Sequence, residues 1–220
     1  MTYLIFVTIL WAFSFSLIGE YLAGEVDPYF SVWIRLALAL ILFLPFLKRK
    51  TASARTVILF TGIGSVQLGL MYIFYYKSFE FLTVPEVLVF TILTPIYVSL
   101  INDLWEGRLN KTYLGTAGLA VTGAAIIRAN PINSDFLMGF FIVQGANLCF
   151  AFGQVAYKRL KAKDGQQIPA LNAFAWFYLG AFLVATVSCI TFGKPQYPSE
   201  NSQWLVLIWL GIGASGVGYF

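Results

Sequence analysis

The chain has 220 residues, of which 59% are hydrophobic and only 11% carry charge. Soluble domains are about 25% charged, so this composition excludes an ordinary soluble enzyme, a disordered chain and a nucleic-acid-binding protein. The sequence has no histidine and two cysteines. It therefore offers no histidine-based zinc site, no histidine-assisted nucleophile and no Cys-x-x-Cys redox pair. We expect no catalytic residues, no metal and no cofactor.

Eight apolar stretches are each long enough to cross most or all of a ~30 Å hydrocarbon layer as a helix. This pattern predicts an all-α membrane protein. The stretches cover residues 3–23, 29–47, 56–77, 82–101, 112–128, 136–158, 169–192 and 202–220. Nothing basic precedes the first stretch, and it is longer than the apolar part of a signal peptide, so we expect it to be a retained helix.

Several helix boundaries carry local sequence signals. Asp27 followed by Pro28 is typical of a cap and a first-turn proline, and Pro169 is expected to open its span in the same way. Thr83 and Glu86 have the spacing of a capping box. Pro95 falls in the middle of span 82–101, where it is expected to free a carbonyl and bend the helix.

Lysine and arginine are unevenly distributed between the predicted loops. With the N-terminus placed in the cytoplasm, the outer loops hold only Lys77, Arg128 and Lys194, and Arg35 lies inside a span. The other ten fall in inner loops, which is a clear positive-inside bias. These ten are Lys48, Arg49, Lys50, Arg55, Arg108, Lys111, Lys158, Arg159, Lys161 and Lys163.

The third and eighth spans contain similar glycine-rich stretches. Residues 61–65 align with residues 210–214, and Gly69 then aligns with Gly218. Small residues at positions 61, 65 and 69, and at positions 211 and 215, are also expected to allow close helix contact. The alignment predicts a five-span unit that occurs twice in opposite orientations, which is typical of transporters.

This repeat divides the chain into residues 1–128, holding spans one to five, and residues 129–220, holding spans six to eight. The second unit stops inside its third span, so we expect about two further helices and a complete bundle of ten (5+5). About eight of these helices fall in this chain.

Arg35 is the most informative residue because a charge inside the bilayer costs up to about 2.5–3.5 kcal/mol on insertion scales. One interpretation is that Arg35 faces a cavity and binds an anionic group, such as a carboxylate, through its planar fork. The other is a structural role, in which Arg35 snorkels to the outer surface or pairs with Glu20 or Glu86.

Other candidate substrate-binding residues are polar or aromatic side chains within spans. Glu86 either only caps its helix or also exchanges a proton during transport. Gln67 and Asn147 are the preferred uncharged polar candidates, although interhelical hydrogen bonds explain most such residues. The aromatic candidates for apolar walls around a ligand are Trp11, Tyr72, Tyr97 and Trp176.

Several motifs resemble the EamA part of the drug/metabolite transporter superfamily. They are the five-plus-five pattern, residues 11–15 (Trp-Ala-Phe-Ser-Phe), Arg35, Pro95 and residues 106–109 (Glu-Gly-Arg-Leu). Longer stretches, at residues 8–16, 19–24 and 172–184, are similar to the bacterial biotin-uptake branch of that family. The resemblance covers essentially the whole chain.

The resemblance implies a bacterial inner-membrane protein of ten helices that takes up biotin by alternating access. The expected partners are a small-molecule substrate (biotin, or another carboxylate or amino acid) and the lipid bilayer. Arg35 would take the carboxylate of biotin, Trp11, Tyr72 and Trp176 its apolar body, and Gln67 and Asn147 its ureido group.

Three alternatives remain open from the sequence. The first is an EamA-type exporter of amino acids or other small metabolites. The second is a membrane enzyme, such as an intramembrane protease or a lipid transferase, which the lack of histidine and of paired membrane aspartates disfavours. The third is a helical scaffold that transports nothing.

Overall fold

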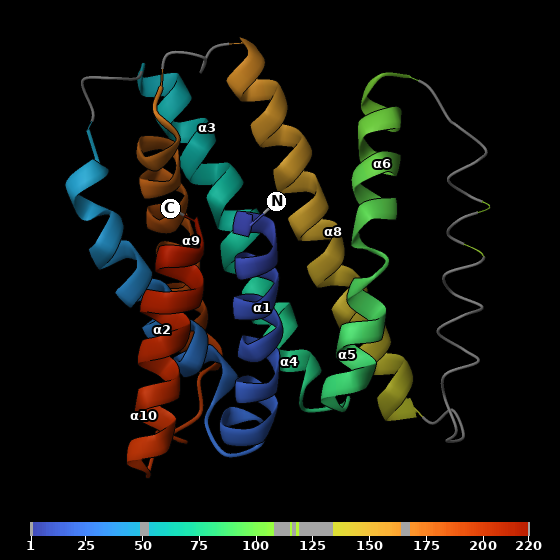
Figure 1. The fold of residues 1–220 in the computed structure, drawn as a ribbon, viewed down its shortest axis with the longest axis vertical. Helices are drawn as coiled ribbons and strands as arrows, with labels where there is room; N and C mark the ends of the chain where they lie inside the picture. Colours follow the sequence, from blue (N-terminus) through green and yellow to red (C-terminus); the bar gives the residue numbers. More distant parts are fainter. Residues whose placement is uncertain are drawn as a thin grey trace.

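The computed structural model describes residues 2–48, 53–107, 115, 118, 134–163 and 168–219. This part of the chain is a bundle of helices without strands (Figure 1). In chain order its elements are α1 (Thr2–Leu17), η1 (Ile18–Leu22), α2 (Pro28–Phe43), η2 (Leu44–Phe46), α3 (Ala54–Gly64), η4 (Ser65–Leu70), α4 (Met71–Ser78), α5 (Val84–Thr91), α6 (Thr94–Trp105), α8 (Ser134–Lys163), α9 (Ala170–Phe192), α10 (Asn201–Ile208), η5 (Trp209–Gly216) and η6 (Val217–Tyr219).

Helical stretches of membrane-spanning length coincide with five of the predicted spans. They are Pro28–Phe46, Ala54–Ser78, Val84–Trp105, Ser134–Lys163 and Ala170–Phe192, and a shorter apolar helix covers Val7–Leu22. The predicted span 202–220 corresponds to α10, η5 and η6. The predicted span 112–128 lies outside the described residues, apart from Gly115 and Gly118.

Three of these spans contain a π-helical segment, which the sequence analysis did not anticipate. The segments are η1, η4 and η5, and each continues directly from an α-helix. A helix that is buried among other helices in a bilayer is apolar on all sides. Its hydrophobic pattern therefore does not reveal the wider π-helical turn.

The predicted helix caps at Asp27 and Thr83 are confirmed. Asp27 accepts a hydrogen bond from the backbone N–H of Phe30 at 2.8 Å, and Pro28 is the first residue of α2. Glu86 accepts from both the backbone N–H and the hydroxyl of Thr83 at 2.9 Å, as expected for a capping box. Pro169 is the cap residue of α9, which begins one residue later than predicted.

Pro95 interrupts its span as predicted, because α5 ends at Thr91 and α6 begins at Thr94. Proline has no N–H to donate to the carbonyl four residues earlier. The chain therefore makes a turn at Ile92 and Leu93 before the helix resumes with Pro95 in its first turn. This break faces α8 and forms one wall of the cavity described below.

Glycines allow the helices of the two predicted units to pack closely. A Cβ added to Gly64 of α3 would lie 2.2 Å from the Cα of Phe177 in α9, and one added to Gly180 of α9 would lie 2.0 Å from the carbonyl oxygen of Thr61. Gly211 in η5 packs against α2 in the same way, with 2.7 Å to the nearest side-chain atom. The close contacts predicted at Thr61 and Gly211 are confirmed.

Helices α2 and α9 are tied to each other at both ends by buried side chains. At one end, a carboxylate oxygen of Asp27, which precedes α2, accepts from the N–H of Lys194, which follows α9, at 3.1 Å. At the other end, the amide of Asn172, near the start of α9, donates to the carbonyls of Phe46 and Lys48, just after α2, at 2.6 and 3.1 Å. These reciprocal contacts fix the position of α2, which carries Arg35.

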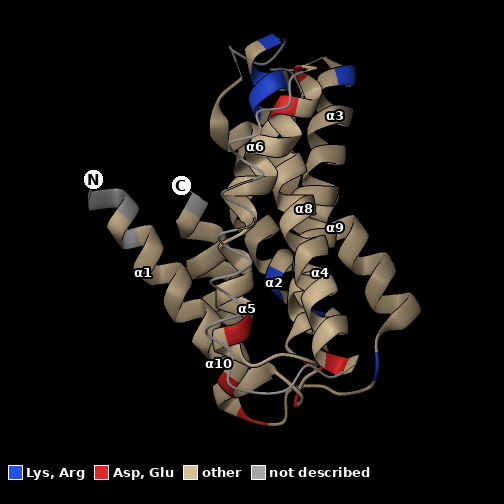
Figure 2. Cartoon of the chain, turned by 90° about the vertical axis from the view of Figure 1, so that its right-hand side faces the viewer, with Lys and Arg blue, Asp and Glu red and all other residues tan. Residues whose placement is uncertain are grey.

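Charge is divided between the two ends of the described bundle (Figure 2). One end is mainly basic and the other mainly acidic. Arg35 is the one basic residue within α2, which runs between the two ends. At the basic end the described basic residues are Lys48, Arg55, Lys158, Arg159, Lys161 and Lys163. The described acidic residues of the opposite end are Glu20, Glu25, Asp27, Glu80, Glu86, Asp135 and Glu200.

We predict that Gly64→Ala destabilises the protein by about 1–3 kcal/mol, because the new methyl group would overlap the backbone of α9. Gly62→Ala is the matched control, since Gly62 lies in the same helix with nothing within 4 Å of an added Cβ. Alanine there should be neutral or stabilising by up to ~1 kcal/mol. Thermal unfolding of the two purified variants in detergent tests this, and equal melting temperatures would contradict the packing described.

Candidate functional site

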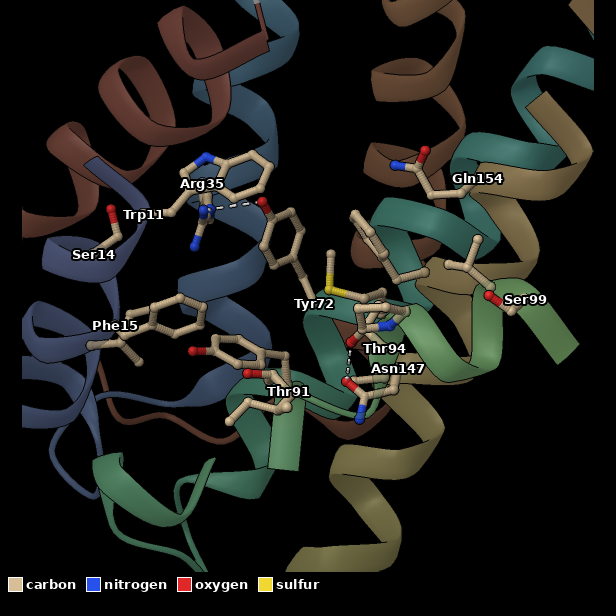
Figure 3. A pocket seen from close by; sticks show the side chains of 18 residues that line it. Trp11, Ser14, Phe15, Arg35, Tyr72, Thr91, Thr94, Ser99, Asn147 and Gln154 are labelled. Atoms are coloured by element: carbon tan, nitrogen blue, oxygen red, sulfur yellow. Dashed lines mark hydrogen bonds between the residues drawn. The ribbon is translucent and has the colours of Figure 1, made fainter. Parts of the chain in front are cut away.

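A cavity of about 880 Å³ lies between α1, α2, η4–α4, the α5–α6 break and α8. Its volume is within the range of small-molecule binding sites. The wall is mainly apolar, and polar groups point into it from two opposite sides (Figure 3). The lining residues are Trp11, Ser14, Phe15, Ile18, Arg35, Met71, Tyr72, Tyr75, Thr91, Ile92, Thr94, Pro95, Val98, Ser99, Ala146, Asn147, Phe150 and Gln154.

Arg35 lies in the wall of the cavity and is only 4% exposed, so it does not snorkel to the surface. Its Nε donates to the hydroxyl of Ser215 at 2.7 Å, Nη1 to the hydroxyl of Tyr76 at 3.2 Å, and Nη2 to the hydroxyl of Tyr72 at 3.1 Å. The guanidinium carbon also lies 4.1 Å from the centre of the Tyr72 ring. Three neutral hydroxyls and an aromatic face therefore orient the cation.

This arrangement leaves the charge of Arg35 without a carboxylate partner among the described residues, and Glu20 and Glu86 do not pair with it. A guanidinium has five N–H groups, and the three hydroxyls take one each. Two N–H groups, one on each terminal nitrogen, remain for a ligand. A buried cation is most stable with an anion beside it, so the geometry favours a carboxylate at this point of the cavity.

Asn147 of α8 connects to the break between α5 and α6. Its amide donates to the carbonyl of Phe90 at 2.9 Å and to Gln144 Oε1 at 3.1 Å, and its oxygen accepts from the hydroxyl of Thr94 at 2.9 Å. The carbonyl of Phe90 lies at the end of α5, where the regular helical bonding stops. Asn147 thus stabilises the break that Pro95 causes, and only its oxygen has capacity left for a ligand.

The structure brings four of the eight predicted substrate-binding residues to the cavity: Trp11, Arg35, Tyr72 and Asn147. Trp11 also donates from its indole nitrogen to the carbonyl of Ala214 at 3.4 Å, which places η5 behind it. These four come from four different helical segments, so the site is a product of the tertiary structure.

The other four predicted residues lie outside the cavity wall. Gln67 and Trp176 are buried, at 2% and 7% exposure, and the Gln67 side chain packs against Gly153 of α8. Glu86 caps α5, and Tyr97 is half-buried on α6. A direct contact of these four with a substrate stays a prediction.

The predicted site missed several lining residues with polar side chains, namely Ser14, Tyr75, Thr91, Thr94, Ser99 and Gln154. The sequence analysis selected Tyr72 but not Tyr75, three residues later in α4, and included neither Ser99 nor Gln154 among the site candidates. The hydroxyl of Tyr75 is buried without a hydrogen-bond partner. A helical register that places Asn147 in the cavity also places Gln154, two turns later, on the same face, and this signal was available in the sequence.

Asn147→Ala is predicted to lower the melting temperature, because it removes hydrogen bonds worth about 0.6–2 kcal/mol each between α8 and the α5–α6 break. At roughly 2–4 °C per kcal/mol the loss should be several degrees. Gln154→Ala is the control, since no internal hydrogen bond of Gln154 occurs in the described structure. If both variants have the melting temperature of the wild type, Asn147 does not stabilise the α5–α6 break.

The chain is similar to known transporters. Residues 1–129 match the EamA-like transporter family. The whole chain is 50% identical to the biotin transporter of Salmonella typhimurium (strain LT2) and 49% identical to the biotin transporter of Escherichia coli (strain K12), covering 74% of each relative. It is also 49% identical to the probable biotin transporter of Pseudomonas aeruginosa (strain PAO1), over 77% of that protein.

One solved crystal structure of a protein superposes with a TM-score of 0.62 over 97% of this chain and 76% of that chain, at 19% identity. At this identity the likeness concerns the fold alone, and it agrees with the helical bundle described above. Together with the family match and the apolar helices, it leads to one conclusion: the chain is a multi-pass membrane protein that belongs to the EamA-like transporter family.

Proposed function

We propose that this protein takes up biotin across the bacterial inner membrane, with the substrate carboxylate bound at Arg35. The proposal is supported by the near 50% identity to biotin transporters along the entire chain. The single structural observation that carries it is a buried guanidinium, without an acidic partner among the described residues, in the wall of a cavity of about 880 Å³.

The composition of the cavity wall suits the chemistry of biotin. The molecule combines a carboxylate, an apolar chain with a thioether ring, and a ureido group that both donates and accepts hydrogen bonds. Arg35 supplies the charge for the carboxylate, and Trp11, Met71 and Phe150 supply apolar contact for the body of the molecule. The free capacity of the Asn147 oxygen suits a ureido N–H.

We further infer an inverted repeat, formed by residues 1–128 and 129–220, that works by alternating access. Two observations support it. The third and eighth spans each contain a π-helical segment that overlaps the aligned glycine-rich stretch, beginning at Ser65 in the third span and at Trp209 in the eighth. The reciprocal contacts of Asp27 and Asn172 relate the second span to the seventh in opposite orientations.

The proposed topology places the N-terminus and the basic end of the bundle in the cytoplasm. The separation of charge along the described bundle supports this orientation, because lysine and arginine are retained on the cytoplasmic side of inner-membrane proteins. The acidic end then faces the periplasm, and Arg35 lies closer to that side, in the first half of α2.

Uptake of radiolabelled biotin tests the proposal. The complete gene, expressed in a bacterial strain that neither makes nor transports biotin, should restore growth at limiting biotin and give saturable uptake. A strain carrying the gene that accumulates no more biotin than the empty-vector strain would contradict the proposal. Right-side-out and inverted vesicles then report the direction of flux and separate uptake from export.

Within the same assay, Arg35→Gln is predicted to raise the KM for biotin about 10- to 100-fold, because it removes a charge-assisted pair worth about 1.5–3 kcal/mol. Arg35→Lys keeps the charge but not the planar fork, so its KM should lie between those of the wild type and Arg35→Gln. Membrane amounts of each variant are measured by immunoblot. An unchanged KM for Arg35→Gln at normal membrane levels would exclude Arg35 as the carboxylate site.

A further inference from the structure

The side of the cavity opposite Arg35 carries polar groups that no internal interaction explains. Figure 3 shows Gln154 and Ser99 across the cavity from Arg35, Trp11 and Ser14. They come from α8 and α6, and both are half-buried. Neither side chain takes part in a hydrogen bond in the described structure.

The other amides of the region differ from Gln154 in this respect. Asn147 uses both of its amide N–H groups internally, and Gln144 accepts from Asn147. Gln67 is 2% exposed, packs against Gly153 and is not one of the residues that line the cavity. Among the amides of the described spans, Gln154 is therefore the one that lines the cavity with both its donor and its acceptor available.

A free primary amide is complementary to a urea or cyclic amide, because each group has N–H donors and a carbonyl acceptor that can pair with the other. A hydroxyl, such as that of Ser99, can serve as either partner. An unpaired amide at the edge of an apolar cavity forms no hydrogen bonds with its apolar neighbours. It therefore adds selectivity mainly when a ligand carries matching polar atoms.

We propose that Gln154, assisted by Ser99, is the specificity-determining residue for the urea-type ring of the substrate. This inference rests on the proposed function, with the carboxylate at Arg35 and the apolar body between the two polar sides. It replaces Gln67, which the sequence had suggested for the ureido group and which lies outside the cavity wall.

The proposal also gives the bound substrate a direction. Both α2 and α8 run from the acidic end of the bundle to the basic end (Figures 1 and 2). Arg35 lies in the first half of α2, whereas Gln154 lies in the last third of α8. The carboxylate is thus nearer the acidic end, and the ring is nearer the basic end.

The test compares two ligands in the uptake assay: biotin, and 5-cyclohexylpentanoic acid, which has a carboxylate and an apolar ring but no urea group. Gln154→Leu should raise the KM for biotin roughly tenfold and leave the inhibition constant of the urea-free acid unchanged. Gln154→Met has a side chain of nearly the same length and no amide, so it should give the same result as Gln154→Leu. It replaces the leucine variant if that variant inserts poorly into the membrane. Gln67→Met is the control, because Gln67 is the same residue type but does not line the cavity, so the variant should not affect discrimination between the two ligands.

Two results would overturn the assignment of Gln154. One is an unchanged KM for biotin in both variants at normal membrane levels. The other is an equal weakening of both ligands, which would mean that Gln154 shapes the cavity without recognising the urea group. Failure of the wild-type protein to take up any biotin is a separate outcome, because it removes the proposed function on which the inference rests.

Discussion

The buried guanidinium of Arg35 is the interaction on which the site depends. Placing a full charge among apolar helices is costly, and the protein offsets this cost with three hydroxyl groups and an aromatic face. Neutral hydroxyls orient the cation without neutralising it, so its positive charge can still attract an anionic ligand in the cavity. An acidic partner in their place would have satisfied the arginine and left little attraction for an anionic ligand.

The scaffold around Arg35 keeps this charge in a fixed position. Helix α2 is held at one end through Asp27 and at the other through Asn172, and Gly211 allows η5 to pack closely against it. The same η5 segment supplies the Ser215 hydroxyl to Arg35. A binding group held in this way loses little conformational entropy when a ligand arrives, which favours affinity. The glycines and the buried polar contacts of the scaffold therefore contribute to function as well as to stability.

Much of the fold was predictable from sequence because its signals are local. The caps at Asp27 and Thr83 and the break at Pro95 follow from the chemistry of neighbouring residues, and the confirmed spans follow from apolar length. The site was only half predictable. Gln67 and Gln154 are the same residue type at similar depth, and which of them faces the cavity is set by the packing of α8 against η4. The partners of Arg35 include Ser215, which is 180 positions away in the sequence, and no local pattern identifies such a contact.

The most direct test of the central claim is equilibrium binding of two ligands to the purified protein. Biotin and its primary amide differ only in the group proposed to meet Arg35, which is a carboxylate in the acid and an uncharged carboxamide in the amide. If the buried guanidinium is an anion site, biotin should bind at least about tenfold more tightly than the amide, since each 1.4 kcal/mol of charge-assisted bonding is worth a factor of ten. Equal affinities for the acid and the amide would contradict the account.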